Sequence, residues 1–398
     1  MNRTFGEAWG DTEGSARARE GFSAVFGGPP SGVWAAPGRV NIIGEHTDYN
    51  RGLCAPIALP HRTFAALTPS ADDVVRLSSA QIDPGRVWQT AMEDVAPGQV
   101  HGWGGYVAGV IWGMRRRGFA VPAVTGFVDS CVPFGAGLSS SAALSCVFAV
   151  AETALIGLPD SDALRQELVL AAIDAENEIV GAATGGLDQS ASLRAEKDHV
   201  LIIDFLDFTT RQVPFGLHDA GLELLVIDTK APHQLNDGQY ASRRATCEQA
   251  AAQLGVSSLR EVSDLEAALA VLGPETVAAR RVRHVVTEIQ RVRDFEVLAA
   301  NGRWADMGPL FAASHRSLRF DYEVTVPELD VAVEAATGAG AIAARMTGGG
   351  FGGSAIALVP AGESGQVADM VCRAFADRGF AAPAFLMADP SSPAGKVG

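Results

Sequence analysis

The sequence predicts an α+β fold with two lobes and a cleft between them. Segments typical of strands alternate with segments typical of helices along the 398 residues, and no internal repeat interrupts them. Hydrophobic residues make up 47% of the chain and charged residues 19%, which supplies ordinary cores for one large domain or two medium-sized ones. A Pro- and Gly-containing stretch at residues 213–221 is the best candidate for a boundary. We therefore expect an N-terminal lobe of residues 1–215 and a C-terminal lobe of residues 216–398.

Short runs of β-branched and aliphatic residues predict the strands. Runs of this kind occupy residues 74–78, 124–128, 201–205, 222–228 and 354–359. Residues 32–41 are small and interrupted by Pro and Gly, and they lead through Ile42 and Ile43 into a polar cluster.

Apolar residues at helical spacing predict the helices. Residues 103–114 show this spacing, and a second helix is expected from residue 142 to about residue 155. Asp160 or Ser161 is a candidate N-cap for the next helix, which we expect to continue through Val180. Residues 240–303 are helical and patterned with charges, and the tail at residues 391–398 is expected to be disordered.

The balance of charges argues against several classes of partner. The chain carries 31 basic and 46 acidic side chains, a net charge of −15. Because no Lys/Arg-rich run offsets this charge, we expect neither nucleic acid nor an anionic membrane as a partner. The apolar stretches are too short to span a bilayer, and residues 1–15 lack the apolar core of a signal peptide. Five scattered cysteines indicate reduced thiols in a cytoplasmic protein. We also expect a monomer.

The most informative stretch is the loop PFGAGLSSSA at residues 133–142. Gly135 and Gly137 let the backbone approach an anion, and the serines that follow open a helix whose first N–H groups have no internal partners. These serines, which can bond phosphate oxygens or ligate Mg²⁺, are Ser139, Ser140 and Ser141. The chain has no GxxxxGK[ST] motif, which excludes a Walker-type grip. The alternative is a capped strand-to-helix turn that binds nothing.

Two carboxylates follow this loop at a spacing of twelve residues. Glu176 falls on the apolar stripe of its predicted helix, where a carboxylate must be neutralised, pair with a cation or bind a metal; alternatively, it reaches solvent at the helix end. Asp188 is presented by a glycine-led turn at residues 184–190, where it can orient or deprotonate an attacking hydroxyl. An Asx-turn or N-cap is the alternative for Asp188. Together the pair is compatible with Mg²⁺ binding and general base catalysis.

A polar cluster near the start of the chain, GRVNIIGEHTDYN at residues 38–50, gathers hydrogen-bonding groups of both signs. Sugar hydroxyls both donate and accept hydrogen bonds, so such a loop suits a polyhydroxylated ligand. A solvated loop is the alternative, but the two isoleucines and the flanking glycines indicate that the loop is held rigidly.

At this point the sequence closely resembles the galactokinases of the GHMP kinase superfamily. Residues 38–49 resemble the sugar motif that is specific to galactokinases. Residues 133–142 resemble the phosphate loop of the superfamily, and residues 346–353 resemble its third, glycine-rich motif. Weaker matches occur at residues 103–106, 184–190, 240–244 and 314–330, so the resemblance extends over residues 33–359.

The resemblance implies a role for each matched residue. Asp188 would be the catalytic carboxylate and Arg39 its charge partner, and both would touch the substrate. Sugar hydroxyls would be bound by Glu45, His46 and Asp48, with help from Gly186 and Tyr240, although Tyr240 could equally be a packing aromatic. ATP would be held by the phosphate loop, with Trp103 and Tyr106 beside the adenine. Ser141 and Glu176 would hold Mg²⁺.

The implied fold has an N-terminal lobe resembling ribosomal protein S5 domain 2 and a ferredoxin-like C-terminal lobe, with the active site between them. The implied reaction moves the γ-phosphate of MgATP to the anomeric hydroxyl of galactose, giving galactose 1-phosphate. Three departures from the family pattern touch no group assigned to chemistry: Leu187, the pair Cys54-Ala55, and Phe320.

Two other functions stay open from sequence. A non-catalytic relative that senses galactose and ATP is disfavoured by the retained Ser141-Ala142-Ala143, Asp188 and Arg39. A kinase for a related sugar, such as N-acetylgalactosamine or arabinose, would differ in pocket volume, which the sequence does not give. Whether Asp188 removes the proton or only stabilises charge beside Arg39 is likewise open.

Overall fold

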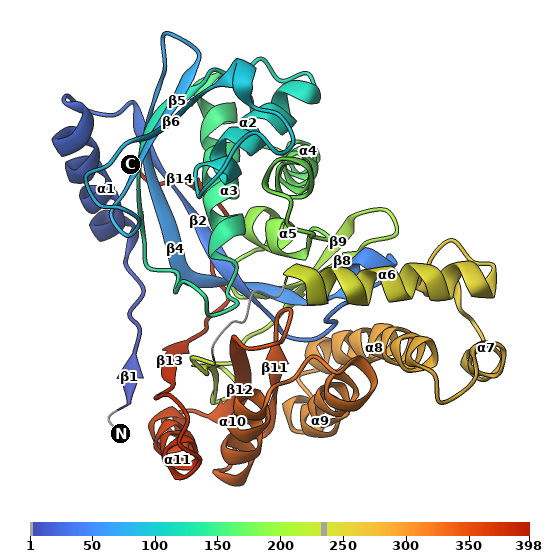
Figure 1. The fold of residues 1–398 in the computed structure, drawn as a ribbon. Helices are drawn as coiled ribbons and strands as arrows, with labels where there is room; N and C mark the ends of the chain where they lie inside the picture. The colour runs from blue at the N-terminus through green and yellow to red at the C-terminus, as the bar shows by residue number, and fades with distance from the viewer. Residues whose placement is uncertain (1–2, 232–236) are drawn as a thin grey trace.

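The computed structural model describes residues 3–231 and 237–398, and within them the strands form sheets of six, five and three strands (Figure 1). The six-stranded and five-stranded sheets lie in different halves of the molecule, each with its own helices. The mixture of helices and sheets in two lobes confirms the predicted α+β class. No helix within these residues is both long and apolar enough to cross a membrane.

The six-stranded sheet builds the upper lobe in Figure 1, in the order β14-β2-β4-β7-β5-β6. Its strands are β2 (Gly32–Asn41), β4 (Pro56–Pro69), β5 (Val74–Ser79), β6 (Trp88–Ala91), β7 (Val124–Ser130) and β14 (Gly395–Lys396). Helix α1 (Asp11–Phe26) packs against β2, β4 and β7, while α3 (Ser140–Leu155) covers β2 and β4. All ten residues of β2 are buried as a result.

Three more helices complete this lobe. These are α2 (Gly105–Arg116), α4 (Asp162–Asp174) and α5 (Leu187–Arg194). Helices α2, α3 and α4 pack against one another, and α5 packs against α3, α4 and β2. The first residue of α5 therefore lies near both the start of α3 and the C-terminal half of β2.

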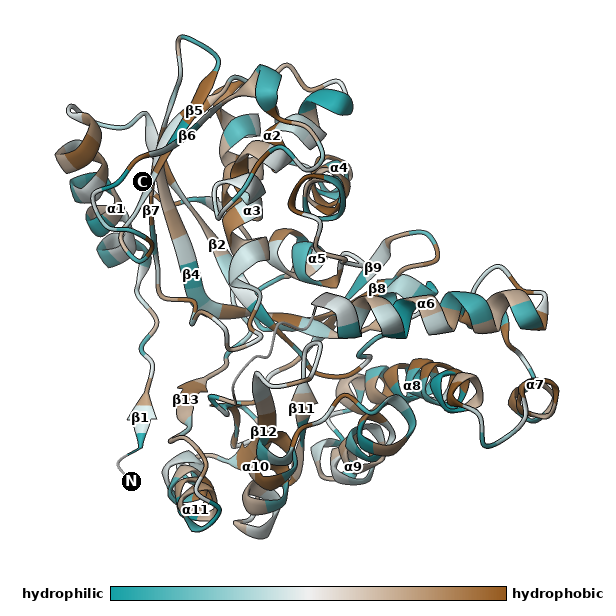
Figure 2. Ribbon diagram, viewed as in Figure 1, coloured by the Kyte–Doolittle hydropathy of each residue, from teal (hydrophilic) through white to brown (hydrophobic). Residues whose placement is uncertain are grey.

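The five-stranded sheet builds the lower lobe, in the order β1-β13-β10-β12-β11. Its strands are β1 (Thr4–Phe5), β10 (Leu222–Asp228), β11 (Ala343–Thr347), β12 (Ser354–Pro360) and β13 (Ala384–Met387). Helices α9 (Met307–Ser317) and α10 (Pro327–Gly338) pack on β11, and α11 (Ser364–Asp377) packs on β10. Strand β12 is buried along nearly its whole length and is coloured as hydrophobic in Figure 2.

A small sheet lies between the lobes, and a helical layer extends beside the C-terminal lobe (Figure 1). The sheet β3-β8-β9 contains β3 (Leu53–Cys54), β8 (His199–Asp204) and β9 (Thr209–Pro214). The helical layer contains α6 (Asp237–Leu254), α7 (Leu265–Leu272) and α8 (Val277–Ala300). Helix α8 contacts β3 and β9 as well as α6 and α9. It thus connects the segment that follows the sugar motif to the C-terminal lobe.

Each end of the chain joins the sheet of the opposite lobe. Strand β1 pairs with β13, and β14 pairs with β2 through Gly395–Ala35 and Lys396–Trp34. The prediction of a disordered tail at residues 391–398 is therefore wrong. The reason is that β2 would otherwise be an open edge, and Val397 packs against the core beneath α1. The division of the chain at residue 215 stays a prediction.

Several element boundaries differ from those expected from sequence. Helix α3 begins at Ser140 rather than Ala142, and α2 begins two residues after Trp103. Ser161 is the N-cap of α4, since its Oγ accepts from the Leu164 N–H at 3.1 Å. The helix expected to run to Val180 leaves α-helical geometry after Asp174, and residues Ala175–Val180 form a π-helical turn. The continuous helical region expected at 240–303 is divided into α6, α7 and α8.

Candidate active site

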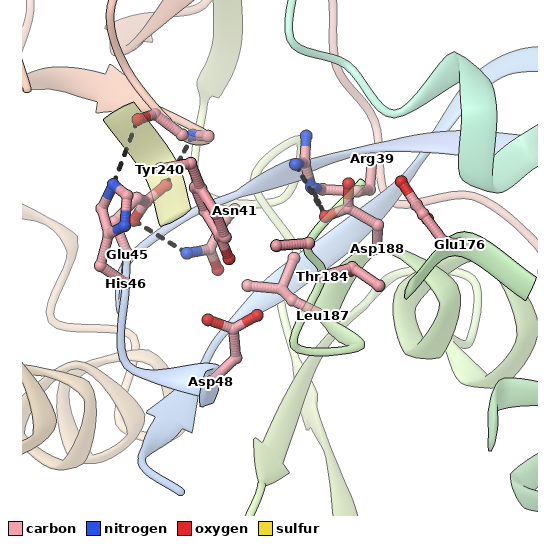
Figure 3. Close-up of a pocket in the computed structure, with 13 residues that line it drawn as sticks. Arg39, Asn41, Glu45, His46, Asp48, Glu176, Thr184, Leu187, Asp188 and Tyr240 are labelled. Atoms are coloured by element: carbon pink, nitrogen blue, oxygen red, sulfur yellow. Dashed lines mark hydrogen bonds and ion pairs between the residues drawn. The ribbon is translucent and has the colours of Figure 1, made fainter. Parts of the chain in front are cut away.

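Two adjoining cavities lie between the lobes. The first cavity has a volume of about 200 Å³ and the second about 390 Å³. Glu176, Ala183, Tyr240 and Gly349 line both, so the cavities share a wall. Figure 3 shows Arg39, Asp188 and Glu176 on one side of the first cavity and Glu45, His46 and Tyr240 on the other. Residues of the sugar motif thus meet Glu176, Asp188 and Tyr240, which come from segments distant in the sequence.

Arg39 and Asp188 form an ion pair at the edge of the first cavity. The Arg39 Nε donates to Asp188 Oδ1 at 2.8 Å, and its Nη2 lies 2.7 Å from the same oxygen. Arg39 is aimed there by an irregularity in the pairing of β2 with β4 between Pro37 and Arg39. Gly38 is required at this point because a Cβ would lie 2.6 Å from the Leu138 carbonyl. Strand β2 therefore touches the phosphate loop directly, and the Arg39 N–H donates to that carbonyl at 3.1 Å.

The second oxygen of Asp188 is bound by the phosphate loop. The Ser139 Oγ donates to Asp188 Oδ2 at 2.5 Å, and Arg39 Nη1 donates to the Gly137 carbonyl at 2.6 Å. Ser139 has a left-handed backbone with φ of 61°, a conformation that L-residues rarely adopt. The hydroxyl that the sequence assigns to phosphate thus contacts the candidate catalytic carboxylate, so the loop and Asp188 act as one unit.

Ser140 and Ser141 occupy the first turn of α3, half-buried and with hydroxyls that bond no other described residue. Unpaired N–H groups at a helix start attract anions. Gly137 lines the second cavity, whereas Gly135 is exposed on the loop. Tyr106 of α2 also lines the second cavity. Trp103 lines neither cavity and packs against the core of the N-terminal lobe.

Glu176 lies in the π-helical turn, on the wall that both cavities share. Its Oε2 accepts from Gln189 Nε2 at 2.6 Å, and no basic side chain of residues 3–231 or 237–398 pairs with it. Burial, and next the negative charge of Asp188, raise the pKa of Glu176 to about 8. A bound cation would restore the charged form. This carboxylate is an oxygen ligand of the kind that Mg²⁺ prefers and fits such an ion, whereas Ser141, the other predicted ligand, lines neither cavity.

Glu45 is buried and held by three hydrogen bonds. Its Oε2 accepts from Asn41 Nδ2 at 2.8 Å and from Arg345 Nη2 at 2.6 Å, and its Oε1 accepts from the Gly348 N–H at 2.9 Å. Only 2% of Glu45 is exposed, and that surface faces the first cavity. Burial raises the pKa of Glu45, and the charge of Arg345 opposes this effect.

His46 is enclosed by aromatic rings. Its ring lies 4.7 Å from that of Tyr322 and 5.5 Å from that of Tyr240. Its Nδ1 bonds the Tyr49 hydroxyl at 2.8 Å, and its Nε2 bonds the Gly349 carbonyl at 3.1 Å. Burial lowers the pKa of His46 to about 3, so the imidazole is neutral at physiological pH. Because both ring nitrogens are bonded within the protein, His46 lines the first cavity as an uncharged ring and not as a cation.

Asp48 lies at the bottom of the first cavity in Figure 3, against the turn that precedes α5. A Cβ on Gly185 would lie 2.2 Å from Asp48 Oδ2, so this turn approaches the carboxylate as closely as glycine permits. Burial, and to a smaller degree the charge of Asp188, raise the pKa of Asp48 to about 6. Gly186 has φ of 103° and begins the turn into α5, but it does not line the first cavity.

The sequence analysis left several site residues unassigned. Asn41, Ala183, Thr184, Leu187, Gly348 and Gly349 line the first cavity, and Phe351 lines the second. Asn41 lies inside the polar cluster, and the glycines lie in the third motif, so the sequence could have predicted both as site residues. Glu288, whose Oε1 accepts from the Gly44 N–H at 3.0 Å, is one charged residue among many on α8 and gives no signal in the sequence.

Three family models match this chain. The galactokinase galactose-binding signature matches residues 20–69. The N-terminal domain of GHMP kinases matches residues 105–196, and their C-terminal region matches residues 295–377. These segments contain the sugar motif, the phosphate loop with Glu176 and Asp188, and the third glycine-rich motif.

Two named relatives match over most of their length. A galactokinase of Streptomyces coelicolor is 46% identical over 396 residues, which cover 99% of this chain and 100% of the relative. A galactokinase of Bos taurus is 40% identical over 88% of this chain and 90% of the relative.

Solved structures agree with these matches. Lactococcus lactis galactokinase complexed with galactose superposes with a TM-score of 0.89 and 31% identity, over 95% of this chain and 98% of that one. Methanococcus jannaschii mevalonate kinase shares only the fold, with a TM-score of 0.62 and 13% identity. With the cleft, the paired Arg39 and Asp188 and the sugar motif all in place, this chain belongs to the galactokinase family and has the two-lobed α+β fold of GHMP kinases.

Proposed function

We propose that this chain is a galactokinase, which transfers the γ-phosphoryl group of ATP to the anomeric hydroxyl of galactose. Family membership supports an ATP-dependent sugar kinase. The observation that carries the proposal is the position of Asp188. This carboxylate faces the cavity lined by the sugar motif, while Ser139 of the phosphate loop bonds its other side.

In the proposed reaction, Asp188 accepts the proton of the anomeric hydroxyl or orients that hydroxyl for attack. As the new bond from the sugar oxygen to the γ-phosphorus forms, the bond to the β-phosphate oxygen breaks and ADP leaves. Arg39 holds Asp188 in place and, with its guanidinium beside the loop, offsets charge that develops on the transferred group. Gly137 and the first N–H groups of α3 would bind the phosphate oxygens.

The sugar would occupy the first cavity. Glu45 and Asp48 accept hydrogen bonds from its hydroxyls, and the neutral ring of His46 is held beside them by Tyr49 and Gly349. Tyr240, which lines both cavities, would separate the sugar from the nucleotide. Gly186 would help through the backbone of the turn that carries Asp188.

ATP would occupy the second cavity, with Tyr106 in the wall of that cavity beside the base. We further propose that Glu176 and Ser141 hold Mg²⁺. When bound, the ion would supply positive charge that offsets the charge of the phosphates. Glu176 then serves as an anionic ligand in place of the neutral carboxyl that burial favours without a cation.

The test is ADP release from MgATP with galactose, N-acetylgalactosamine, glucose, arabinose or no sugar. The expected result is strong turnover that is selective for galactose. Turnover with a different sugar would support a sugar kinase but assign it a different substrate. If no sugar supports turnover but galactose binds saturably by calorimetry, the chain is a sensor and the proposal is wrong.

We also propose that the protein is a cytoplasmic monomer. All five cysteines are free thiols, which is typical of proteins in a reducing compartment. Light scattering coupled to gel filtration measures the mass directly, and a mass near twice 41.4 kDa would contradict the monomer.

A further inference from the structure

The side chain of Glu45 depends on an arginine from the other lobe. Arg345, in the middle of β11, is fully buried. Its Nη2 donates to Glu45 Oε2 at 2.6 Å, and its Nη1 donates to the Ile42 carbonyl at 2.9 Å. The same guanidinium thus binds both the backbone of the sugar motif and the carboxylate that the motif presents.

A buried glutamate on α8 supports this arginine. Glu288 is fully buried, and its Oε1 lies 3.7 Å from Arg345 Nη2. The same oxygen accepts from Ser314 Oγ at 2.7 Å and from the Gly44 N–H at 3.0 Å, while Oε2 accepts from Arg291 Nε at 2.6 Å. Two carboxylates and two guanidinium groups therefore share one enclosed space, with charges that balance.

Side chains of α8 also hold the backbone before and after the Glu45 side chain. Glu288 binds the N–H of Gly44, and His284, one turn earlier on α8, bonds the Glu45 carbonyl through Nε2 at 3.1 Å. Of the three bonds to the Glu45 carboxylate, two come from Arg345, in the middle of β11, and from Gly348, which directly follows this strand. The position of this sugar-facing group is hence set largely by the C-terminal lobe.

We propose that Arg345 and Glu288 are positioning residues for Glu45: they hold its carboxylate in the orientation that reads one hydroxyl of the sugar. This inference rests on the proposed function, because it takes galactose as the ligand of the first cavity. It differs from a merely structural role in a specific way. If Arg345 acts through Glu45, its loss removes discrimination at one hydroxyl and leaves the others unchanged.

The experiment compares kcat/KM for galactose with that for each monodeoxygalactose. In the wild type, kcat/KM for the deoxysugar that lacks the hydroxyl bound by Glu45 should be about tenfold or more below that for galactose, because a buried acceptor is left unpaired. This loss of kcat/KM is called the penalty for that hydroxyl. The Glu45→Ala variant identifies that hydroxyl, because in this variant the penalty for that hydroxyl disappears. Arg345→Met should reduce the same penalty to within about twofold, keep the other penalties, and raise KM for galactose far more than KM for ATP.

Arg345→Lys is the conservative variant, and it should recover part of the discrimination because it returns the charge without the two-pronged geometry. Arg62→Met is the matched control: Arg62 is a buried arginine that pairs with Asp11 at 2.7 Å and lines neither cavity. It should lower stability without altering any penalty. Should Arg345→Met fail to fold, Glu288→Gln takes its place, with a smaller loss at the same hydroxyl.

The proposal is overturned if the Arg345 or Glu288 variants keep the wild-type pattern of penalties, or lose kcat/KM equally with every sugar. Failure of the proposed function would look different. In that case the wild type would not turn over galactose, and the comparison would be made by calorimetry with the sugar that binds.

Discussion

At the scale of single residues, the candidate catalytic carboxylate is defined by what holds it. Arg39 binds one oxygen of Asp188 and Ser139 binds the other. A hydroxyl that approaches from the first cavity therefore meets a carboxylate whose direction is already fixed. Pre-organisation of this kind lowers the barrier because no group has to reorient during the reaction.

We expect Asp188→Asn to lower kcat by about 10²–10⁴-fold, because the amide cannot accept the proton. Galactose affinity, measured by calorimetry, should change only a few-fold, since Glu45, His46 and Asp48 remain. Asp162→Asn is the matched control, because Asp162 also pairs with an arginine, Arg194, at 2.8 Å but lines neither cavity. Near-normal turnover of Asp188→Asn would show that the carboxylate is neither base nor stabiliser.

Glu176 allows a separate test of the metal. Because its pKa is raised to about 8, the carboxyl binds a proton in competition with a cation near neutral pH. The concentration of Mg²⁺ required for half-maximal turnover should therefore fall as pH rises from 6 to 8. Glu176→Gln should raise that concentration about tenfold or more and remove its pH dependence. A pH-dependent requirement that persists in Glu176→Gln would assign the effect to another group.

The sequence predicts most of this site because its residues cluster in short motifs. Arg39, Glu45, His46 and Asp48 lie within one stretch, and Asp188 follows a glycine pair that marks a turn. Arg345 and Glu288 escape prediction for a physical reason. Their importance comes from full burial beside Glu45, and burial of a charged residue on a charge-patterned helix depends on tertiary packing that periodicity does not encode.

At the scale of elements, α3 combines the phosphate loop at its start with a buried acid further along. Glu152 is fully buried in α3, and neither of its carboxylate oxygens has a hydrogen-bond partner among the described residues. Burial raises the pKa of Glu152 to about 8 from an ordinary value of 4.5. The group is therefore held neutral in the folded protein at pH 7 while it is ionised in the unfolded chain.

The sign of the resulting pH dependence follows from this difference. Between pH 4.5 and pH 8 the folded state binds a proton that the unfolded state has lost, so the free energy of unfolding falls as pH rises through this window. Each unit of pKa difference corresponds to roughly 1.4 kcal/mol. Glu152→Gln should therefore be more stable than the wild type at pH 8, with little difference near pH 4.5. Urea unfolding at pH values across this range measures the free energy of unfolding of both proteins. A difference between them that does not change with pH would contradict the prediction.

The π-helical turn shows where periodicity stops being informative. Leu164, Leu168 and Ala172 follow the helical spacing that predicts a helix through Val180, and Glu176 continues it. The chain nevertheless widens to π geometry from Ala175, which is common at functional sites. A single extra residue per turn leaves the stripe of apolar residues recognisable while it changes the direction of Glu176.

At the scale of the whole molecule, the two lobes are tied together by both ends of the chain as well as by the site. Strand β1 extends the C-terminal sheet before α1 enters the N-terminal lobe, and β14 returns from β13 to pair with β2 (Figure 1). Alternation of strands and helices predicts the α+β class, but it does not predict this exchange. Two-residue strands carry no periodicity, and their pairing depends on which sheet edge is open.

The final prediction concerns this C-terminal strand, which pairs with the strand that carries Arg39. Val33 donates its N–H to the Gly398 carbonyl at 2.8 Å and accepts from the Val397 N–H at 2.9 Å. Deletion of residues 395–398 removes these bonds, exposes the edge of β2 and removes Val397 from the core beneath α1. We expect a loss of about 1–3 kcal/mol in the free energy of unfolding. Activity per folded molecule at 25 °C should be retained, because β14 pairs with Trp34 and Ala35 and not with the end of β2 that carries Arg39.

The control is Lys396→Ser, which keeps the backbone bonds and should cost less than about 1 kcal/mol. If the truncated chain unfolds at the same urea concentration as the full one, the terminal strand does not contribute to the stability of the lobe.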